Sequence, residues 1–440
     1  MKNEIFIKLI NFLKIEEINY CILGNTNEYP SKIGGDIDIV IDSEKFKEVN
    51  SIVSRFSIAY EIEICNLLQH ESEGKYFVAS TVNNTNGNFS MLALDFCANY
   101  MRQGRIILTD IELLNSRQLV GKNGVEFWVC SNDVAFIYYL IKKIEKQNIN
   151  VEQFEYLHNL WLQDRGRIIE QLYKRFHETS SQKLIEIFDK SDFTGFSKDF
   201  FKTLSIESQS KYQRSFITEI FEFKRKVYRF TKPTGLIISV LGCDGSGKST
   251  VIDHLMNDSP DFEAFRGTEY HHLFATKNKA SGKAPVTNPH DQIPRSWMMS
   301  NLKLMYFLFK YIFGYWLIAY PQKVRSKLVI FDRYYYDILV DPRRYRHNGS
   351  LLLTQFIGRI IPKPDLFFVI DAPAEILQQR KQEVSFEESK RQGQAYLDLK
   401  YKLNHLSIID NTQRAEIASF EVKKVLYSYL VNRYNKRYRV

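Results

Sequence analysis

The chain has 440 residues, of which 44% are hydrophobic and 25% are charged. At about 150 residues per domain this length predicts about two or three domains, and the composition excludes a disordered or collagen-like chain. The formal net charge of +9 favours phosphorylated or otherwise anionic partners, but the basic residues are too scattered to indicate nucleic acid. The five cysteines are far apart and form no CxxC pair, which predicts reduced thiols in a cytoplasmic protein.

Two segments bear on membrane association. The N-terminal segment is amphipathic and charged throughout, so it lacks the uninterrupted apolar core of a signal peptide. The most apolar run, Leu302–Tyr320, is interrupted by Lys303 and Lys310, and its uncharged part is shorter than the roughly 20 residues of a spanning helix. We expect a helix packed on the protein core. Its aromatic residues and lysines also suit peripheral contact with the inner face of a membrane.

The chain divides by composition into three parts. Residues 1–150 mix β-type and helical runs, residues 151–231 show the apolar spacing of a helical connector, and the breaker cluster Thr231–Gly235 indicates a hinge. Residues 232–440 alternate strand-like and helical runs, which is typical of a parallel sheet with crossover helices. The sequence therefore predicts an α/β protein with an N-terminal α+β domain, a helical connector and a C-terminal parallel-sheet domain. The expected strands are Tyr20–Gly24, Ile37–Ile41, Phe89–Phe96, Glu126–Cys130, Leu236–Leu241, Leu328–Phe331, Leu366–Ile370 and Leu406–Ile409.

The strongest motif is GCDGSGKS, which starts at Gly242, satisfies GxxxxGK[ST] and lies between an apolar strand and an expected helix, Thr250–Met256. Its glycines let backbone N–H groups surround a polyphosphate, and the N-terminus of the helix adds partial positive charge. Lys248 would reach the β- and γ-phosphates, and the Ser249 hydroxyl would ligate Mg²⁺. The motif thus predicts a binding site for ATP and Mg²⁺ formed by Gly242, Asp244, Gly245, Ser246, Gly247, Lys248, Ser249 and Thr250.

A second apolar run ends in Asp332-Arg333-Tyr334. A carboxylate at the end of a parallel strand can hold a metal beside bound phosphates, so Asp332 is a candidate metal ligand. From Lys323 to Arg346 the chain carries seven basic and three acidic residues, and arginine forks suit phosphate oxygens. This segment is a candidate clamp for an anionic acceptor, with a solvated basic turn as the alternative.

The segments GCDGSGKST and FDRY together resemble the thymidylate kinase family of P-loop nucleoside monophosphate kinases, over about Gly235 to Val431. The resemblance implies in-line phosphoryl transfer from ATP, with Asp244 contacting the sugar of the acceptor and Arg333 holding its phosphate. It also implies a mobile lid that supplies Arg380, Lys381 or Arg391 to the transferring phosphoryl group.

The chain departs from that family in two places. The TREPG-like segment, which helps to place the monophosphate acceptor, is replaced by Arg266–His272 and a polar loop that runs to His290. Val384 stands where a second lid arginine would follow Arg380. The sequence is similar in this respect to the thymidylate-kinase-like proteins of bacterial surface-polysaccharide gene clusters, which implies a sugar or glycan hydroxyl as acceptor.

In the N-terminal part, Leu23-Gly24-Asn25 followed by Gly34-Gly35-Asp36-Ile37-Asp38 resembles the nucleotidyltransferase superfamily. Side chains at i and i+2 of a strand share one face, so Asp36 and Asp38 can bracket divalent cations, and Asp95 is the candidate third ligand. Two Mg²⁺ ions held in this way would activate a hydroxyl and stabilise a leaving pyrophosphate. The superfamily usually has Ser where this chain has Asn25, so an active metal site and a degenerate, regulatory domain both stay open.

These patterns leave two hypotheses for the function. The first is an ATP-dependent kinase that phosphorylates a nucleoside monophosphate or a carbohydrate hydroxyl, with a second, nucleotidyltransferase activity left open. The second is a nucleotide-gated interaction or regulatory protein, in which ATP binding controls contact with a partner. A homodimer is compatible with both.

Overall fold

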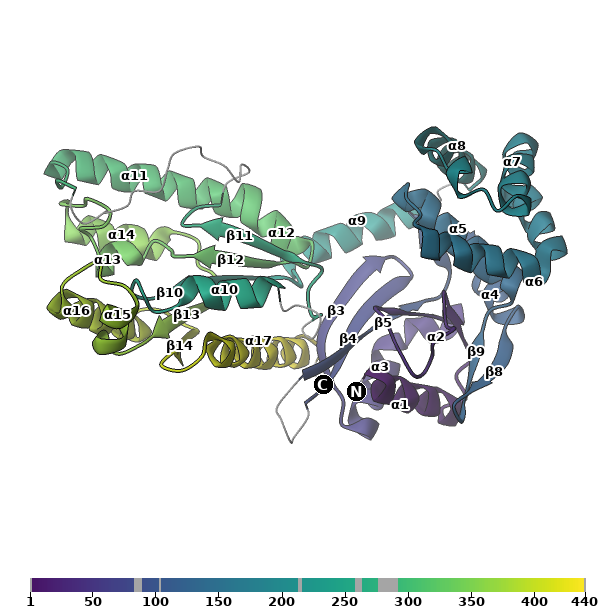
Figure 1. Ribbon diagram of the computed structural model, residues 1–440, viewed down its shortest axis with the longest axis horizontal. Helices are drawn as coiled ribbons and strands as arrows, with labels where there is room; N and C mark the ends of the chain where they lie inside the picture. Colours follow the sequence, from purple (N-terminus) through teal and green to yellow (C-terminus); the bar gives the residue numbers. More distant parts are fainter. Residues whose placement is uncertain are drawn as a thin grey trace. The chain divides into compact units, whose positions relative to one another are not determined.

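The structure is a computed structural model that describes residues 2–82, 89–102, 104–212, 216–257, 263–275 and 292–438, so the part of the predicted polar loop from residue 276 to His290 lies outside the described residues (Figure 1). The chain folds as two compact units, Met1–Val227 with Tyr434–Val440, and Tyr228–Arg433. The protein is a mixed α/β protein, as predicted, and its five cysteines are free thiols.

The first unit is built on a mixed sheet with the strand order β3-β4-β5-β2-β1-β9-β8. In this sheet β2 pairs antiparallel with β1 and parallel with β5, and β1 pairs parallel with β9. Strands β6 and β7 form a separate pair. The strands are β1 Tyr20–Leu23, β2 Ile37–Ile41, β3 Glu63–Glu71, β4 Gly74–Val82, β5 Phe89–Cys97, β6 Tyr100–Arg102, β7 Arg105–Leu108, β8 Gln118–Lys122 and β9 Val125–Val129.

Helices cover both faces of this sheet, and the alternate side chains of each strand point to opposite faces. Tyr20 and Ile22 of β1 pack into a core with the first and third helices, whereas Cys21 and Leu23 pack into a core with the fifth and sixth. The helices of the unit are α1 Lys2–Ile15, α2 Ser43–Lys47, α3 Val49–Tyr60, α4 Asp110–Asn115, α5 Asn132–Lys146, α6 Val151–Arg175, α7 Glu178–Asp189, α8 Lys198–Lys211 and α9 Phe216–Thr231, the last of which continues past Val227.

The predicted helical character of residues 151–231 is confirmed. Helix α6 starts at a capping box formed by Asn150 and Gln153, a local signal that satisfies two backbone N–H groups at the helix end. Trp161 of α6 and Leu204 of α8 share one core with α5, so these helices are packed onto the first unit. The division into domains 1–150, 151–231 and 232–440 stays a prediction.

The second unit contains a parallel sheet with the order β11-β12-β10-β13-β14. All six residues of the central strand, β10, are buried, which explains its continuous apolar sequence. The four strands predicted here are confirmed to within one residue at their ends, and β11 is an additional edge strand. The strands are β10 Leu236–Leu241, β11 Thr268–His272, β12 Leu328–Asp332, β13 Leu366–Asp371 and β14 Leu406–Asp410.

Helices connect these strands and cover the sheet (Figure 1). Ile237 and Leu241 of β10 face a core that also holds Leu304, Ile357 and Tyr396 from three of these helices. A π-helical turn, Tyr315–Ala319, joins two helices of the apolar run. The helices are α10 Lys248–Asn257, α11 Trp297–Gly314, α12 Tyr320–Val324, α13 Asp337–Val340, α14 Leu351–Ile360, α15 Ala374–Arg380, α16 Phe386–Leu397 and α17 Ala415–Tyr438.

The apolar run differs from the core helix that we expected. Within the described part of the chain, helix Trp297–Val324 is long and apolar enough, by length and composition, to cross a membrane. Only 28% of its most apolar stretch of 18 residues is buried in the protein. Leu304, Phe307 and Tyr311 pack into the core of the second unit, whereas the opposite side of the helix is exposed. The expectation therefore holds for one face of this helix only.

Candidate functional site

The glycine-rich loop follows the central strand of the parallel sheet. β10 ends at Leu241 and α10 begins at Lys248, so the loop lies at the carboxyl end of the sheet, where open α/β sheets bind ligands. Gly242, Gly245 and Gly247 have φ angles of +141°, +81° and +87°. Only glycine adopts these angles without strain, so the loop requires its glycines for conformation as well as for access to phosphate.

The strand β14 supports this loop from the side. Asn411, the residue after β14, donates from Nδ2 to the carbonyl oxygen of Ser246 at 2.7 Å. A Cβ atom on Gly247 would collide with the Asn411 amide, and one on Gly242 would collide with the carbonyl oxygen of Ile370. The sequence analysis did not single out Asn411, because its contact with the loop spans 165 residues.

Lys248 is buried inside the loop. Its Nζ donates to the carbonyl oxygens of Gly242 at 2.9 Å and of Cys243 at 2.7 Å. Burial, together with repulsion from Arg333, lowers the pKa of Lys248 to about 8. The ammonium group is thus held at the mouth of the loop by backbone dipoles that an anion could replace. Ser249 and Thr250, which follow it on α10, are exposed.

Asp332 lies at the end of β12, next to the loop in the sheet. Its carboxylate is buried and accepts a hydrogen bond from the hydroxyl of Tyr270 on β11 at 2.9 Å. Its other oxygen, Oδ1, is buried without a hydrogen-bond partner among the described residues. A buried carboxylate oxygen without a donor suits a cation, so Asp332 fits the chemistry of a Mg²⁺ ligand, and the exposed Ser249 hydroxyl at the start of α10 is a ligand of the same oxygen type.

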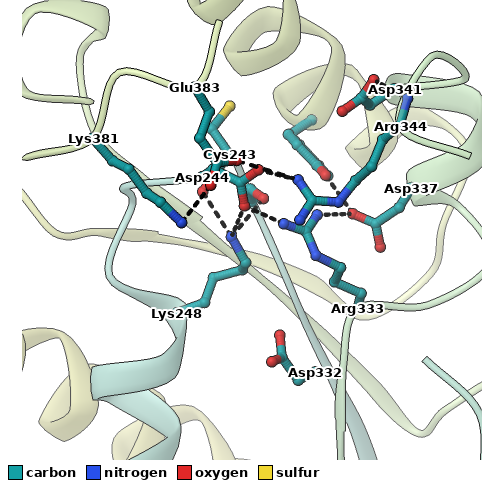
Figure 2. A network of polar contacts seen from close by, with 12 residues as sticks. Cys243, Asp244, Lys248, Asp332, Arg333, Asp337, Asp341, Arg344, Lys381 and Glu383 are labelled. Atoms are coloured by element: carbon teal, nitrogen blue, oxygen red, sulfur yellow. Dashed lines mark hydrogen bonds and ion pairs between the residues drawn. The ribbon is translucent and has the colours of Figure 1, made fainter. Parts of the chain in front are cut away.

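Asp244 is the centre of a network of charged side chains (Figure 2). Arg333 and Arg344 each donate to one of its carboxylate oxygens. Burial by itself would raise the pKa of Asp244, but the charges of Arg333 and Lys248 outweigh this effect and hold the pKa well below its usual range. Asp244 is therefore ionised, and it joins the loop to the strand end that carries Arg333.

A second buried carboxylate fixes Arg333 from behind. Asp337 accepts a hydrogen bond from Arg333 at 3.3 Å, from the backbone N–H of Tyr334 at 2.9 Å, and from the Tyr396 hydroxyl. Asp337 is completely buried, and φ of Arg333 is +70°, a left-handed conformation that costs energy for a residue other than glycine. The guanidinium group is thus set in one orientation, facing the loop.

The three residues that the resemblance assigned to a lid, Arg380, Lys381 and Arg391, have different surroundings in the structure. Lys381 pairs with Glu383, and Glu383 lies 3.7 Å from Arg344, so both belong to the edge of the Asp244 network (Figure 2). Arg380 is exposed and donates to the carbonyl oxygen of Gln413 at 3.5 Å. Arg391 pairs with Glu388 on its own helix.

Besides Asp337, two members of the network were not singled out as site residues from the sequence. Arg344 was part of the predicted basic segment, but nothing distinguished it from its neighbours Arg343 and Arg346. Glu383 carried no signal at all. The convergence of Arg344 on Asp244 joins positions 100 residues apart, so the fold, rather than the local pattern, selects it.

The structure also brings together the three predicted carboxylates of the first unit. Asp38 on β2 pairs in register with Asp95 on β5, and Asp36 directly precedes β2. One oxygen atom from each of the three carboxylates lies within 4.8 Å of the other two. Asp36 is exposed, and Asp38 and Asp95 are half-buried. Three converging carboxylate oxygens are the ligand type that Mg²⁺ prefers.

Two basic side chains contact this carboxylate cluster. Lys142 on α5 donates to Asp38 Oδ2 at 2.9 Å, and His70 on β3 lies with Nε2 2.6 Å from Asp95 Oδ1. Burial and repulsion from Asp36 and Asp95 raise the pKa of Asp38, although the charge of Lys142 opposes the shift. No local pattern marks Lys142 or His70, because each lies far along the chain from its partner.

A cavity of about 360 Å³ is lined by two of these carboxylates, Asp36 and Asp38. Its walls include Asn25, which occupies the position where the resemblance led us to expect Ser. They also include four lysine side chains next to Asp36 and Asp38, so the cavity combines cationic groups for an anion with carboxylates for a metal. These lysines are Lys32, Lys142, Lys143 and Lys146.

No protein-family model and no curated protein matches this chain. Among solved structures, the chain is similar to a thymidylate kinase from Ehrlichia chaffeensis, with 20% sequence identity and a TM-score of 0.32. The match covers 44% of this chain and 100% of that kinase.

A substitution in the loop tests its tight packing. Gly247→Ala forces a side chain into a left-handed backbone conformation and against Asn411, so we expect the second unit to lose about 1 kcal/mol or more of stability. Differential scanning calorimetry measures this as a lower melting temperature for that unit. Gly393→Ala is the matched control: it lies within α16 with no atom within 4 Å of the added Cβ, and should leave stability unchanged or slightly raised. Equal melting temperatures for Gly247→Ala and the unsubstituted chain would contradict the packing argument.

Proposed function

We propose that the chain is an ATP-dependent phosphotransferase of the P-loop kinase type, and that its second unit binds ATP with Mg²⁺. The observation that carries this proposal is the loop from Gly242 to Gly247, which ends a buried central strand and encloses the ammonium group of Lys248. Backbone N–H groups at a helix N-terminus and a buried cation together favour a polyphosphate. The sequence motif and the loop geometry support the same ligand by independent routes.

In this proposal Lys248 exchanges its carbonyl partners for phosphate oxygens. Ser249 and Asp332 hold Mg²⁺, which when bound would neutralise phosphate charge. Thr250, on the first turn of α10, lies beside the same phosphates. The new bond forms between an acceptor oxygen and the γ-phosphorus, and the bond from that phosphorus to the bridging β-phosphate oxygen breaks, so that ADP leaves.

The acceptor would contact the Asp244 network. A monophosphate would compete with Asp244 for the forks of Arg333 and Arg344, whereas a sugar hydroxyl would donate to Asp244. We favour a carbohydrate or glycan hydroxyl, because the chain has the edge strand β11 where the thymidylate kinase family has its acceptor segment. A nucleoside monophosphate is the other acceptor class. In this conformation Lys381, rather than Arg380, lies beside the Asp244 network.

The alternative is a nucleotide-gated interaction protein. The network joins the phosphate loop through Asp244 and Arg344 to Glu383 in the segment between α15 and α16. A nucleotide that draws Lys248 and Arg333 toward its phosphates would alter these ion pairs and could change a partner-binding surface.

Incubation of the full chain with labelled ATP and panels of dTMP, other nucleoside monophosphates, sugars and glycans separates the two functions. Transfer to an acceptor supports the kinase, and tight ATP binding without transfer supports the gated protein.

Lys248→Ala should reduce phosphoryl transfer by about a hundredfold or more, because the substitution removes the cation that faces the transferring phosphate. The melting temperature should change little, since Nζ contacts two loop carbonyls and the Asp244 carboxylate of the same loop rather than the apolar core. Transfer is measured with labelled ATP and the acceptor that the panel experiment identifies. Lys402→Ala removes an exposed lysine elsewhere in the unit and should leave the rate unchanged. Undiminished transfer by Lys248→Ala would reject the assignment of the donor site.

The lowered pKa of Lys248 predicts how ATP affinity depends on pH. Below the free-state value of about 8, Lys248 is protonated both with and without ligand, so affinity is independent of pH. Bound phosphates favour the ammonium form and raise its pKa, so above this value binding takes up a proton and Kd rises by up to about tenfold per pH unit. Calorimetry at about pH 9 in two buffers of different ionisation heat measures the uptake. It should be absent in Lys248→Ala, and its absence in the unsubstituted chain would show that Lys248 does not meet the phosphates.

For the first unit we propose a metal-dependent, nucleotidyltransferase-like site formed by Asp36, Asp38 and Asp95. The convergence of the three carboxylates supports it, and the lysine-lined cavity beside them provides cationic partners for a nucleotide's phosphates. When bound, Mg²⁺ would polarise the attacking and leaving oxygens. If the domain is degenerate, the same cluster would bind metal or nucleotide without turnover.

Asp36→Asn should weaken Mg²⁺ or Mn²⁺ binding to the first unit by about tenfold or more, because a hard cation loses one anionic ligand. Isothermal titration calorimetry with the metal alone measures this effect, and kinase turnover should not change. Glu44→Gln removes an exposed carboxylate outside the cluster and serves as the control. A parallel fall in metal binding and kinase turnover would mean that the two sites are coupled.

A further inference from the structure

The second unit carries an exposed apolar face on the helix that runs from Trp297 to Val324. Residues spaced three or four apart place their side chains on one side of a helix, and here that side is aromatic and aliphatic. Phe309 and Phe313, for example, stack with ring centroids 6.4 Å apart and are each more than half exposed. The exposed large side chains are Trp297, Met298, Met299, Leu302, Met305, Tyr306, Phe309, Phe313, Trp316 and Leu317.

Helix α14 extends this face. Ser350, the N-cap residue that precedes α14, donates its backbone N–H to Asn301 Oδ1 of α11 at 2.9 Å, and the two helices pack side by side. Figure 1 shows α11 as a long helix at the margin of the unit, with α14 next to it. The exposed side chains of α14 are also apolar, and together with those of α11 they form what we call the α11–α14 face. These are Leu351, Leu352, Phe356 and Ile360.

The same helix is anchored to the unit along its other side. Leu304, Phe307 and Tyr311 are buried in the core of the parallel-sheet unit, and Tyr311 packs against Tyr334 with ring centroids 4.7 Å apart. Lys310 is held over the ring of Phe274 at 5.3 Å. A helix anchored in this way cannot leave the unit to cross a bilayer, so its exposed side can only lie on a surface.

The two sequence segments that carry this face contain charged residues of one sign. Within residues 292–331 and 342–364 the sequence contains no aspartate or glutamate. Lys303 and Lys310 are half-buried at the edge of the face, where each contacts the ring of Tyr306, and Arg359 and Lys363 are exposed at the end of α14. Lysines beside exposed aromatic rings match the headgroup region of a membrane, where rings are half immersed and ammonium groups meet phosphates.

We propose that the α11–α14 face binds the surface of an anionic lipid bilayer. Apolar side chains would enter the boundary between headgroups and acyl chains, and the basic residues would pair with lipid phosphates. A second copy of the chain fits this face less well. In a two-fold interface the face would meet itself, and its lysines and arginines would face their own kind without a carboxylate to pair with. This inference does not depend on the phosphotransferase activity.

Vesicle co-sedimentation of the full chain tests the proposal. The probes are vesicles of phosphatidylcholine alone and of phosphatidylcholine mixed with phosphatidylglycerol. We expect binding to the anionic vesicles to be at least about tenfold stronger and to weaken with added salt, because both terms of the interaction are needed. Phe309→Glu with Phe313→Glu should lower this binding by about tenfold or more. Lys303→Glu with Lys310→Glu should remove the preference for anionic lipid.

Two controls keep the result specific. Tyr401→Glu in the second unit and Ile206→Glu in the first place a charge at other exposed apolar positions, and both should bind vesicles normally. Melting temperatures and ATP binding of each variant show that it is folded. Unchanged vesicle binding by the Phe309 and Phe313 variant, or no binding by the unsubstituted chain, overturns the proposal. A dimer that this variant abolishes, without vesicle binding, also overturns it and assigns the face to self-association.

Discussion

The site in the second unit depends on how the central strand of its sheet ends. β10 is buried along its whole length between β12 and β13. The chain that leaves the sheet at Gly242 therefore has close neighbours on both sides. The carbonyl of Ile370 and the amide of Asn411 leave no room for side chains in the loop, and three glycines with positive φ are the result. The backbone N–H groups that a phosphate would need are therefore positioned by the sheet itself, before any ligand is present.

Charge balance determines the rest of that site. Lys248, Arg333 and Arg344 converge on a small volume, where three cations would repel one another without Asp244 between them. Asp337 compensates Arg333 from the buried side. The carboxylates hold the cations in place of a ligand, and Lys248 and Arg333 are already buried, whereas Arg344 is partly exposed. A polyphosphate or an anionic acceptor would therefore exchange one anionic partner for another, which costs less than withdrawing the cations from water.

The sequence was informative where a structure is decided by neighbouring residues. The run Leu236–Leu241 and the glycines after it specify a buried strand and a phosphate-type loop locally, and the alternation of aspartates at 36 and 38 places both carboxylates on one side of β2. The sequence did not predict contacts between residues that lie far apart along the chain. Strand β11 has the polar sequence TEYHH, and only its pairing with β12 makes it a strand. Arg344, Asn411, Lys142 and His70 each meet their partner across a long stretch of chain, so no local pattern marks them.

The apolar run near position 310 shows a different limit. Its sequence is apolar on nearly all sides, so periodicity cannot tell which face packs on the core, and a core helix was the reasonable expectation. The structure places Tyr311 inside and Phe309 outside, although both are aromatic. The discriminating feature was the charge: carboxylates are missing from residues 292–331, and a helix exposed to water alone would gain solubility from both signs of charge. Such one-signed composition around an exposed aromatic stripe indicates that the surface is matched to an anionic counterpart.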